Sequence, residues 1–172
     1  MITSESSDMK FAIGDKVVHP QHGVGFVSGM EEKQFPSSAA RMYYVVSIPD
    51  TTLWVPVDLS TSGLRKLGLK SELEQCRRVL QASPQALSAG KDLLSNLSAR
   101  IKQGSIIAQC EVVRDLQAFG WQKPLYGPLA DFQRMAMEVL CQEWAAVKGI
   151  TQADASYEIT GLLKKGRASE EH

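Results

Sequence analysis

The first third of the chain alternates apolar and polar positions in short runs that turn residues interrupt. The runs lie at 16–19, 24–35, 41–49 and 52–57. Period-two alternation over short runs is typical of half-buried β-strands. No connection between them is long enough to hold a crossover helix, so parallel βαβ packing is excluded. The pattern therefore predicts a small barrel-like sheet.

The alternation also predicts which side chains face the core of this sheet. Gly23 and Gly25 flank a valine at a point where a strand must bend sharply. The expected core consists of Val17, Val24, Val27, Tyr43, Val45, Ile48 and Val55.

After residue 66 the apolar spacing changes to three and four residues, which predicts helices. Five segments show this spacing, at about 71–83, 88–103, 106–119, 129–147 and 151–163. The sequence Ser71 to Glu74 resembles a capping box at the start of the first segment. The chain is therefore predicted to be an α+β protein of two modules, a small β-barrel or sheet followed by an all-α bundle of about five helices.

The predicted boundaries follow from the same change of pattern. We expect a flexible N-terminus at 1–10, a β module at 11–67, a helical module at 68–164 and a disordered tail at 165–172. No signal peptide is visible, and the apolar runs are much shorter than a membrane span. A cytoplasmic protein without membrane contact is predicted.

Charge and cysteine content narrow the classes of function. Lys and Arg number 19, and Asp and Glu also number 19. The net charge of the chain therefore does not attract nucleic acid, and any DNA contact must depend on a local group of basic residues. Cys76, Cys110 and Cys141 lie in apolar helical segments without paired spacing. They are predicted to be reduced core thiols rather than a disulfide framework or a zinc site.

Residues that carry chemistry are sparse. His19 and His22 lie close together in the turn sequence HPQHG, but no third metal ligand accompanies them. They are predicted to be turn or surface histidines. No phosphate-binding loop, zinc-protease motif or nucleophile elbow occurs in the sequence. Neither an enzyme nor a cofactor is expected.

The three tryptophans have different expected roles. Trp54 points outward if Leu53 and Val55 face inward, although it could equally cover the sheet or pack on the helical module. Trp121 is expected to seal the helical bundle, with exposure as the alternative. Trp144 has helical spacing with Leu140 and is expected in the core.

One segment has a more specific pattern. Residues 11–25, FAIGDKVVHPQHGVG, resemble the opening of the CarD/CdnL family of bacterial transcription proteins. They also resemble the related RNA polymerase-interaction domain of transcription-repair coupling factors. The similarity continues through residues 43–46, 55–57 and 63–65, and through residues 104–116 in the helical part. Helices rather than helicase motifs follow the first module, which favours CarD/CdnL.

The resemblance implies a Tudor-like β module that binds the β subunit of RNA polymerase by pairing a sheet edge with its partner. A protein of this kind modulates transcription initiation. Matched residue by residue, the contact edge lies on Glu31, Lys33, Phe35, Leu53, Trp54 and Val55. Trp54 stands where family members often have a basic side chain.

The resemblance also implies a DNA contact, in which a Trp of the helical module wedges into the minor groove and a basic patch follows it. The equivalent position lies near Ala89 and Gly90, and this chain has no Trp between Trp54 and Trp121. The basic residues that remain there are Lys91, Arg100 and Lys102. We therefore expect weak or altered contact with promoter DNA within the polymerase complex. The alternative function is a non-enzymatic adaptor with the same fold and a different protein partner.

Overall fold

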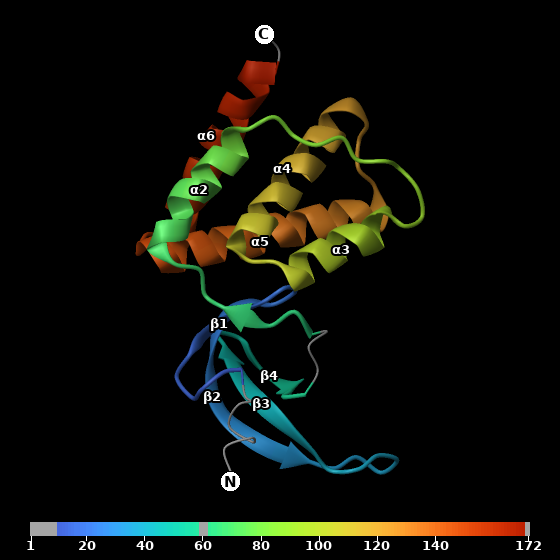
Figure 1. Ribbon diagram of the computed structural model, residues 1–172, viewed down its shortest axis with the longest axis vertical. Helices are drawn as coiled ribbons and strands as arrows, with labels where there is room; N and C mark the ends of the chain where they lie inside the picture. Colours follow the sequence, from blue (N-terminus) through green and yellow to red (C-terminus); the bar gives the residue numbers. More distant parts are fainter. Residues whose placement is uncertain (1–9, 59–61, 171–172) are drawn as a thin grey trace.

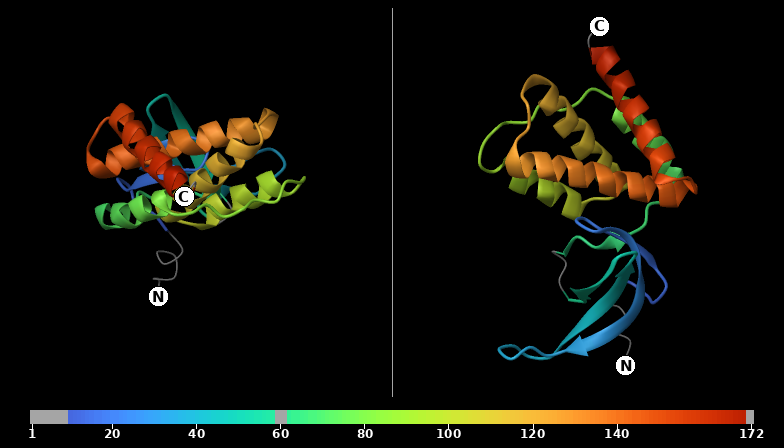
Figure 2. Two further views of the ribbon diagram at one scale, coloured as in Figure 1. Left: turned by 90° about the horizontal axis from the view of Figure 1, so that it is seen from above. Right: turned by 180° about the vertical axis from the view of Figure 1, so that it is seen from behind.

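The computed structural model describes residues 10–58 and 62–170 and confirms two modules of different architecture (Figure 1). The first module is a five-stranded antiparallel sheet with the order β4-β3-β2-β1-β5. Its strands are β1 (Lys16–His19), β2 (Gly23–Lys33), β3 (Arg41–Ile48), β4 (Thr51–Pro56) and β5 (Arg65–Lys66). The long hairpin of β2 and β3 extends away from the helices (Figures 1 and 2).

The core of the sheet differs from the predicted one in strand β3. Tyr44 and Val46 are buried, whereas Tyr43 and Val45, which were predicted to be buried, lie on the opposite face and are only half-buried. Five consecutive residues of β3 are apolar, so alternation alone could not identify the inner face. Tyr44 is suited to burial because its hydroxyl accepts hydrogen bonds from the backbone N–H groups of Lys10 and Phe11, at 2.9 and 3.3 Å.

The rest of the predicted β core is largely confirmed. Val17, Val27 and Val55 are buried, and Val24 and Ile48 are half-buried. Phe11 and Leu64 complete the core.

Five helices follow within the described residues, as predicted. They are α2 (Lys70–Gln81), α3 (Leu93–Gln103), α4 (Ile106–Gln122), α5 (Gly127–Lys148) and α6 (Gln152–Glu170). Helix α3 begins later than expected, at the first of the buried residues Leu93, Leu97 and Ile101, which are spaced by four. Trp144 is fully buried, and the three cysteines are buried free thiols. None of the described helices is both long and apolar enough to cross a membrane.

The predicted disordered tail is wrong for residues 165–170, which form the end of α6. Gly166 is buried against the backbone carbonyls of Leu80 and Gln81, where a side chain would be crowded. The guanidinium of Arg167 lies 4.6 Å from the centre of the Trp121 ring, which is half-buried. This packing orders the end of the helix. Residues 171–172, and the predicted flexible segment apart from Lys10, lie outside the described residues.

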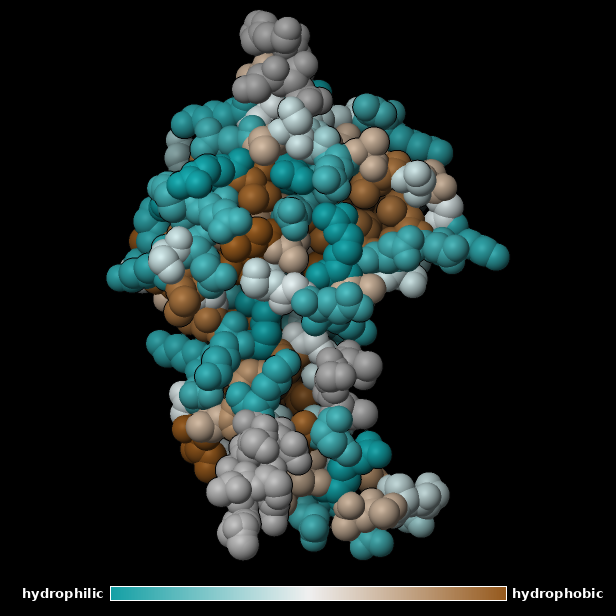
Figure 3. All heavy atoms as spheres, viewed as in Figure 1, coloured by the Kyte–Doolittle hydropathy of each residue, from teal (hydrophilic) through white to brown (hydrophobic). Residues whose placement is uncertain are grey.

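A buried ion pair joins the two modules. Arg65 of β5 donates through both terminal guanidinium nitrogens to the carboxylate of Glu143 on α5, each at 2.6 Å. The backbone N–H of Gly68 donates to the same carboxylate at 2.8 Å, and the Glu143 side chain has no exposed surface. Beside it, the backbone N–H of Val24 donates to Gln142 Oε1 at 3.2 Å. In the space-filling view the molecule narrows where the two modules meet (Figure 3).

Candidate protein-docking edge

Besides the two-residue edge strand β5, which pairs only with β1, two stretches of described backbone in the β module have a neighbouring strand on one side only. Strand β4 is at the edge of the sheet and pairs only with β3. Strand β1 covers β2 only from Gly23 to Phe26, so the second half of β2 also pairs only with β3. Unpaired strand edges present N–H and C=O groups to which another strand can be added.

The register shows which residues of β4 present these groups. The Val57 N–H donates to the Met42 carbonyl at 3.1 Å, so these two residues form a hydrogen-bonded pair. Hydrogen-bonded and non-hydrogen-bonded pairs alternate in an antiparallel ladder. Leu53 and Val55, opposite Val46 and Tyr44, therefore direct their backbone groups toward β3.

It follows that Thr52 and Trp54 direct their N–H and C=O groups away from the sheet. Pro56 contributes only a carbonyl because proline has no N–H group. Sequence reasoning did not single out Thr52, since the direction of its backbone groups depends on the pairing register. The same alternation on the other side of β3 makes Met30 and Glu32 the outward-directed residues of β2.

The outer face of the sheet carries an exposed aromatic and charged surface. Trp54 is 42% exposed, so the outward alternative is observed of those that the sequence left open. The Lys33 ammonium lies 3.7 Å from its ring centre. Phe35 is 52% exposed and meets Tyr43 edge to face, with 6.3 Å between ring centres. Cation–π and edge-to-face contacts hold these side chains in place before any partner arrives.

The six predicted contact residues are divided between two faces. Glu31, Lys33 and Trp54 alternate onto the outer face with Tyr43, and Phe35 packs beside them. Leu53 and Val55 project to the inner face, where Val55 is 5% exposed and Leu53 packs on the core. We call Thr52, Trp54, Lys33, Tyr43 and Phe35 the docking surface.

The three basic residues that were expected to contact DNA do not form a single patch of free charges. Lys91 precedes α3 and Lys102 lies near its end, and both are exposed. Arg100 instead donates to Asp115 at 3.2 Å. The Asp115 carboxylate is fully buried and also accepts from the Arg114 side chain and the Gln85 backbone N–H, both at 2.9 Å. Arg100 therefore belongs to the internal structure of the bundle.

His19 ends β1 and His22 lies in the turn that leads to β2, with their ring centres 4.9 Å apart. Burial, together with the nearby charges of His22 and Lys102, lowers the pKa of His19 to about 4. His19 Nδ1 accepts a hydrogen bond from the Gln21 N–H at 3.1 Å, which requires that nitrogen to be unprotonated. His19 is thus a neutral structural residue of this turn.

The position that the resemblance assigns to a tryptophan lies in an exposed segment. Ala89 and Gly90 line a mostly apolar hollow of about 330 Å³ beside the loop between α4 and α5. Tyr126, on the rim of this hollow, is 74% exposed. Sequence reasoning missed Tyr126 because only folding brings its loop next to the start of α3.

Comparisons with known proteins agree with this architecture. The family model described as "CarD-like/TRCF RID domain" matches residues 11–68, which contain the whole described sheet. The Bacillus subtilis (strain 168) protein named "Putative transcription factor YdeB" is 32% identical over 146 residues. The aligned region covers 83% of this chain and 95% of that protein, and so includes both modules.

Proposed function

Since the chain belongs to the CarD/CdnL-like family of transcription factors, we propose that it docks on the β subunit of RNA polymerase and modulates transcription initiation. The docking element is the free edge of β4. The observation that carries the proposal is the outward direction of the Thr52 and Trp54 backbone groups beside an exposed aromatic face.

Strand addition accounts for both affinity and choice of partner. The N–H and C=O groups of Thr52 and Trp54 pair with a short strand of the polymerase, and this supplies affinity without dependence on sequence. The Trp54 ring and the Lys33 ammonium above it then contact the side chains of that strand on the outer face. A large aromatic side chain fixed by a neighbour is the kind of residue that dominates binding energy at interfaces.

The helical module makes only a weak contact with promoter DNA in this proposal. Lys91 and Lys102 are exposed cations, whereas Arg100 is tied to Asp115. Tyr126 is the exposed aromatic residue beside the position where the family has its wedging tryptophan. Two phosphate contacts correspond to a salt slope of about −2 for log affinity against log salt concentration. Binding to fork-junction DNA without polymerase should therefore be weak, and a steep slope at sub-micromolar affinity would contradict this part of the proposal.

A substitution that removes one backbone donor tests the docking directly. Thr52→Pro deletes the outward N–H and leaves the hydrogen bonds between β4 and β3 intact, and proline is tolerated at such edge positions. The matched control, Thr52→Ala, changes the side chain and keeps the N–H. We expect Thr52→Pro to lose capture of the purified polymerase β subunit, while Thr52→Ala and the unmodified protein retain it.

Two results would overturn the proposal. One is equal capture by the proline and alanine variants, provided that circular dichroism shows both to be folded. The other is a stable complex, isolated from cells, that contains a different partner and no polymerase, which would favour the adaptor function.

A further inference from the structure

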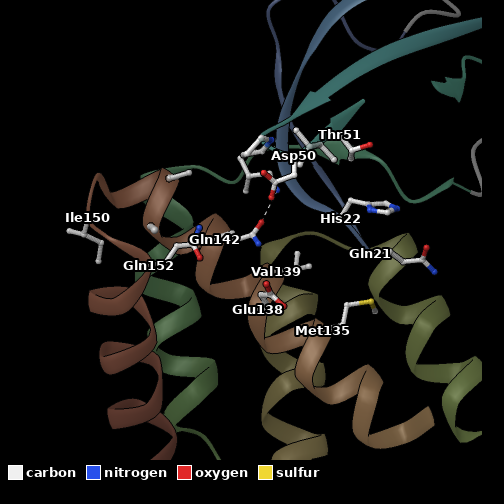
Figure 4. A pocket seen from close by; sticks show the side chains of 15 residues that line it. Gln21, His22, Asp50, Thr51, Met135, Glu138, Val139, Gln142, Ile150 and Gln152 are labelled. Carbon is white, nitrogen blue, oxygen red and sulfur yellow. Dashed lines mark hydrogen bonds between the residues drawn. The ribbon is translucent and has the colours of Figure 1, made fainter. Parts of the chain in front are cut away.

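A second candidate binding site lies where the two modules meet, and none of the five residues of the docking surface lines it. It is an open cleft of about 740 Å³. Figure 4 shows His22, Asp50 and Thr51 from the β module on one side, and Met135, Glu138 and Val139 from α5 on the other. Ile150, between α5 and α6, and Gln152, the first residue of α6, line one end.

The walls of the cleft are held in a fixed relation to each other. Gln142 reaches from α5 to the Val24 N–H, and the buried Arg65–Glu143 pair lies next to it in sequence and structure. Gly23 has φ +87° and lies so close to the Gln142 side chain that a Cβ atom would clash with the amide. The cleft is therefore formed before any ligand binds, which lowers the entropic cost of binding.

The lining combines an apolar floor with uncompensated negative charge. Val24, Ile48, Met135 and Ile150 are among the apolar residues that line it. Asp50 and Glu138 are exposed, and neither has an ion pair or a side-chain hydrogen bond within the described residues. No lysine or arginine is among the described residues that line the cleft. The site therefore repels anions, including nucleic-acid phosphates, and attracts cations.

We propose that this cleft binds a basic polypeptide segment in which cationic side chains alternate with apolar ones. The cations meet Asp50 and Glu138, and the apolar side chains cover the floor between the modules. The side-chain amides of Gln21 and Gln152 are placed to hydrogen-bond the backbone of an extended segment. The apolar floor distinguishes such a segment from a small polyamine, which would leave that surface exposed to water.

The test uses the full chain and a short fluorescein-labelled peptide in which arginine alternates with leucine. We expect saturable binding by fluorescence anisotropy at low salt, with loss of affinity as salt is added. The double variant Asp50→Asn/Glu138→Gln should bind about fivefold more weakly, because each exposed charge pair contributes a fraction of a kcal/mol. The control Asp92→Asn/Asp131→Asn makes the same change in net charge at exposed sites outside the cleft and should leave affinity unchanged.

Three outcomes would overturn the proposal. The first is that a peptide with glutamate in place of arginine binds equally well, which would show that the charge of the peptide is irrelevant. The second is that the control variant weakens binding as much as the cleft variant, which would show that the attraction is non-specific. The third is that spermidine binds with the same dependence on Asp50 and Glu138 while the peptide does not, which would make the cleft a small-polycation site. All three are independent of whether Thr52→Pro abolishes polymerase capture.

Discussion

Polar groups are arranged in opposite ways along the free edge of β4 and at the joint between the modules, where Arg65 and Glu143 pair. At the joint, one carboxylate accepts three hydrogen bonds and has no exposed surface. Along the edge of β4, the outward backbone groups of Thr52 and Trp54 have no strand beside them in the described part of the chain. A region whose polar groups are all satisfied contributes to the fold, whereas one with unsatisfied groups and exposed aromatic rings is available to a partner.

The largest effect is expected when the joint is broken. Glu143→Ala leaves the mostly buried Arg65 guanidinium and the Gly68 N–H without their acceptor. Removing one member of a buried ion pair costs about 3–5 kcal/mol, and urea unfolding would measure this loss of stability. Glu158→Ala serves as the control because its contacts with Arg77 and Lys148 are partly exposed. It should cost about 1 kcal/mol or less. Equal losses in the two variants would show that burial of the joint contributes nothing.

A substitution in the docking surface should reduce affinity for the partner more than it reduces stability. Trp54→Ala removes a ring that is 42% exposed, so the free energy of unfolding should change by about 1 kcal/mol or less. Affinity for the polymerase β subunit should fall by about 2 kcal/mol, or roughly 30-fold, as for a central aromatic residue of an interface. Surface plasmon resonance and urea unfolding on the same protein would separate the two effects. A large loss of stability with unchanged affinity would reverse the assignment of the two regions.

His19 should make the stability of the folded chain depend on pH. The pKa of His19 is about 4 in the folded chain, below the ordinary histidine value of 6.5. The unfolded chain therefore binds more protons between these values, and stability should fall as the pH decreases from about 6.5 toward 4. The contribution should be about 1–2 kcal/mol after allowance for partial exposure. His19→Gln should lose this part of the pH dependence in urea unfolding at several pH values, whereas His22→Gln should retain most of it.

The smallest effect concerns the contact between Lys33 and Trp54. Lys33→Met keeps the aliphatic stem and removes the ammonium that lies 3.7 Å from the ring centre. The cation–π contact at an exposed site contributes about 0.5–1 kcal/mol. A double-mutant cycle with Trp54→Ala, measured by thermal unfolding, should give a coupling energy of this size. A coupling energy near zero would indicate that the ammonium does not restrain the ring.

Local sequence patterns predicted the two modules and the helices, because each depends on residues close together in the chain. For Trp54 they left outward exposure as one of two alternatives. The inner face of β3 was predicted wrongly because both faces of that strand are apolar around Tyr43 and Tyr44. The role of Thr52 depends on the pairing register, and Arg65 and Glu143 are 78 positions apart. The ion pair of Arg100 with Asp115 could not be predicted either, since the Asp115 side chain is buried by contacts that only the folded bundle creates.

Pro56 limits the length of the strand that can be added to the free edge of β4. Strand β4 ends at this residue, so the border offers amide hydrogens at only two positions, Thr52 and Trp54. Fibrillar assembly requires long, flat strands that stack with every amide engaged by the next chain. A border with two donors can add one short segment but is a poor template for self-propagating growth. The protein can therefore keep a sheet margin open for its partner with little risk that copies of itself polymerise along it.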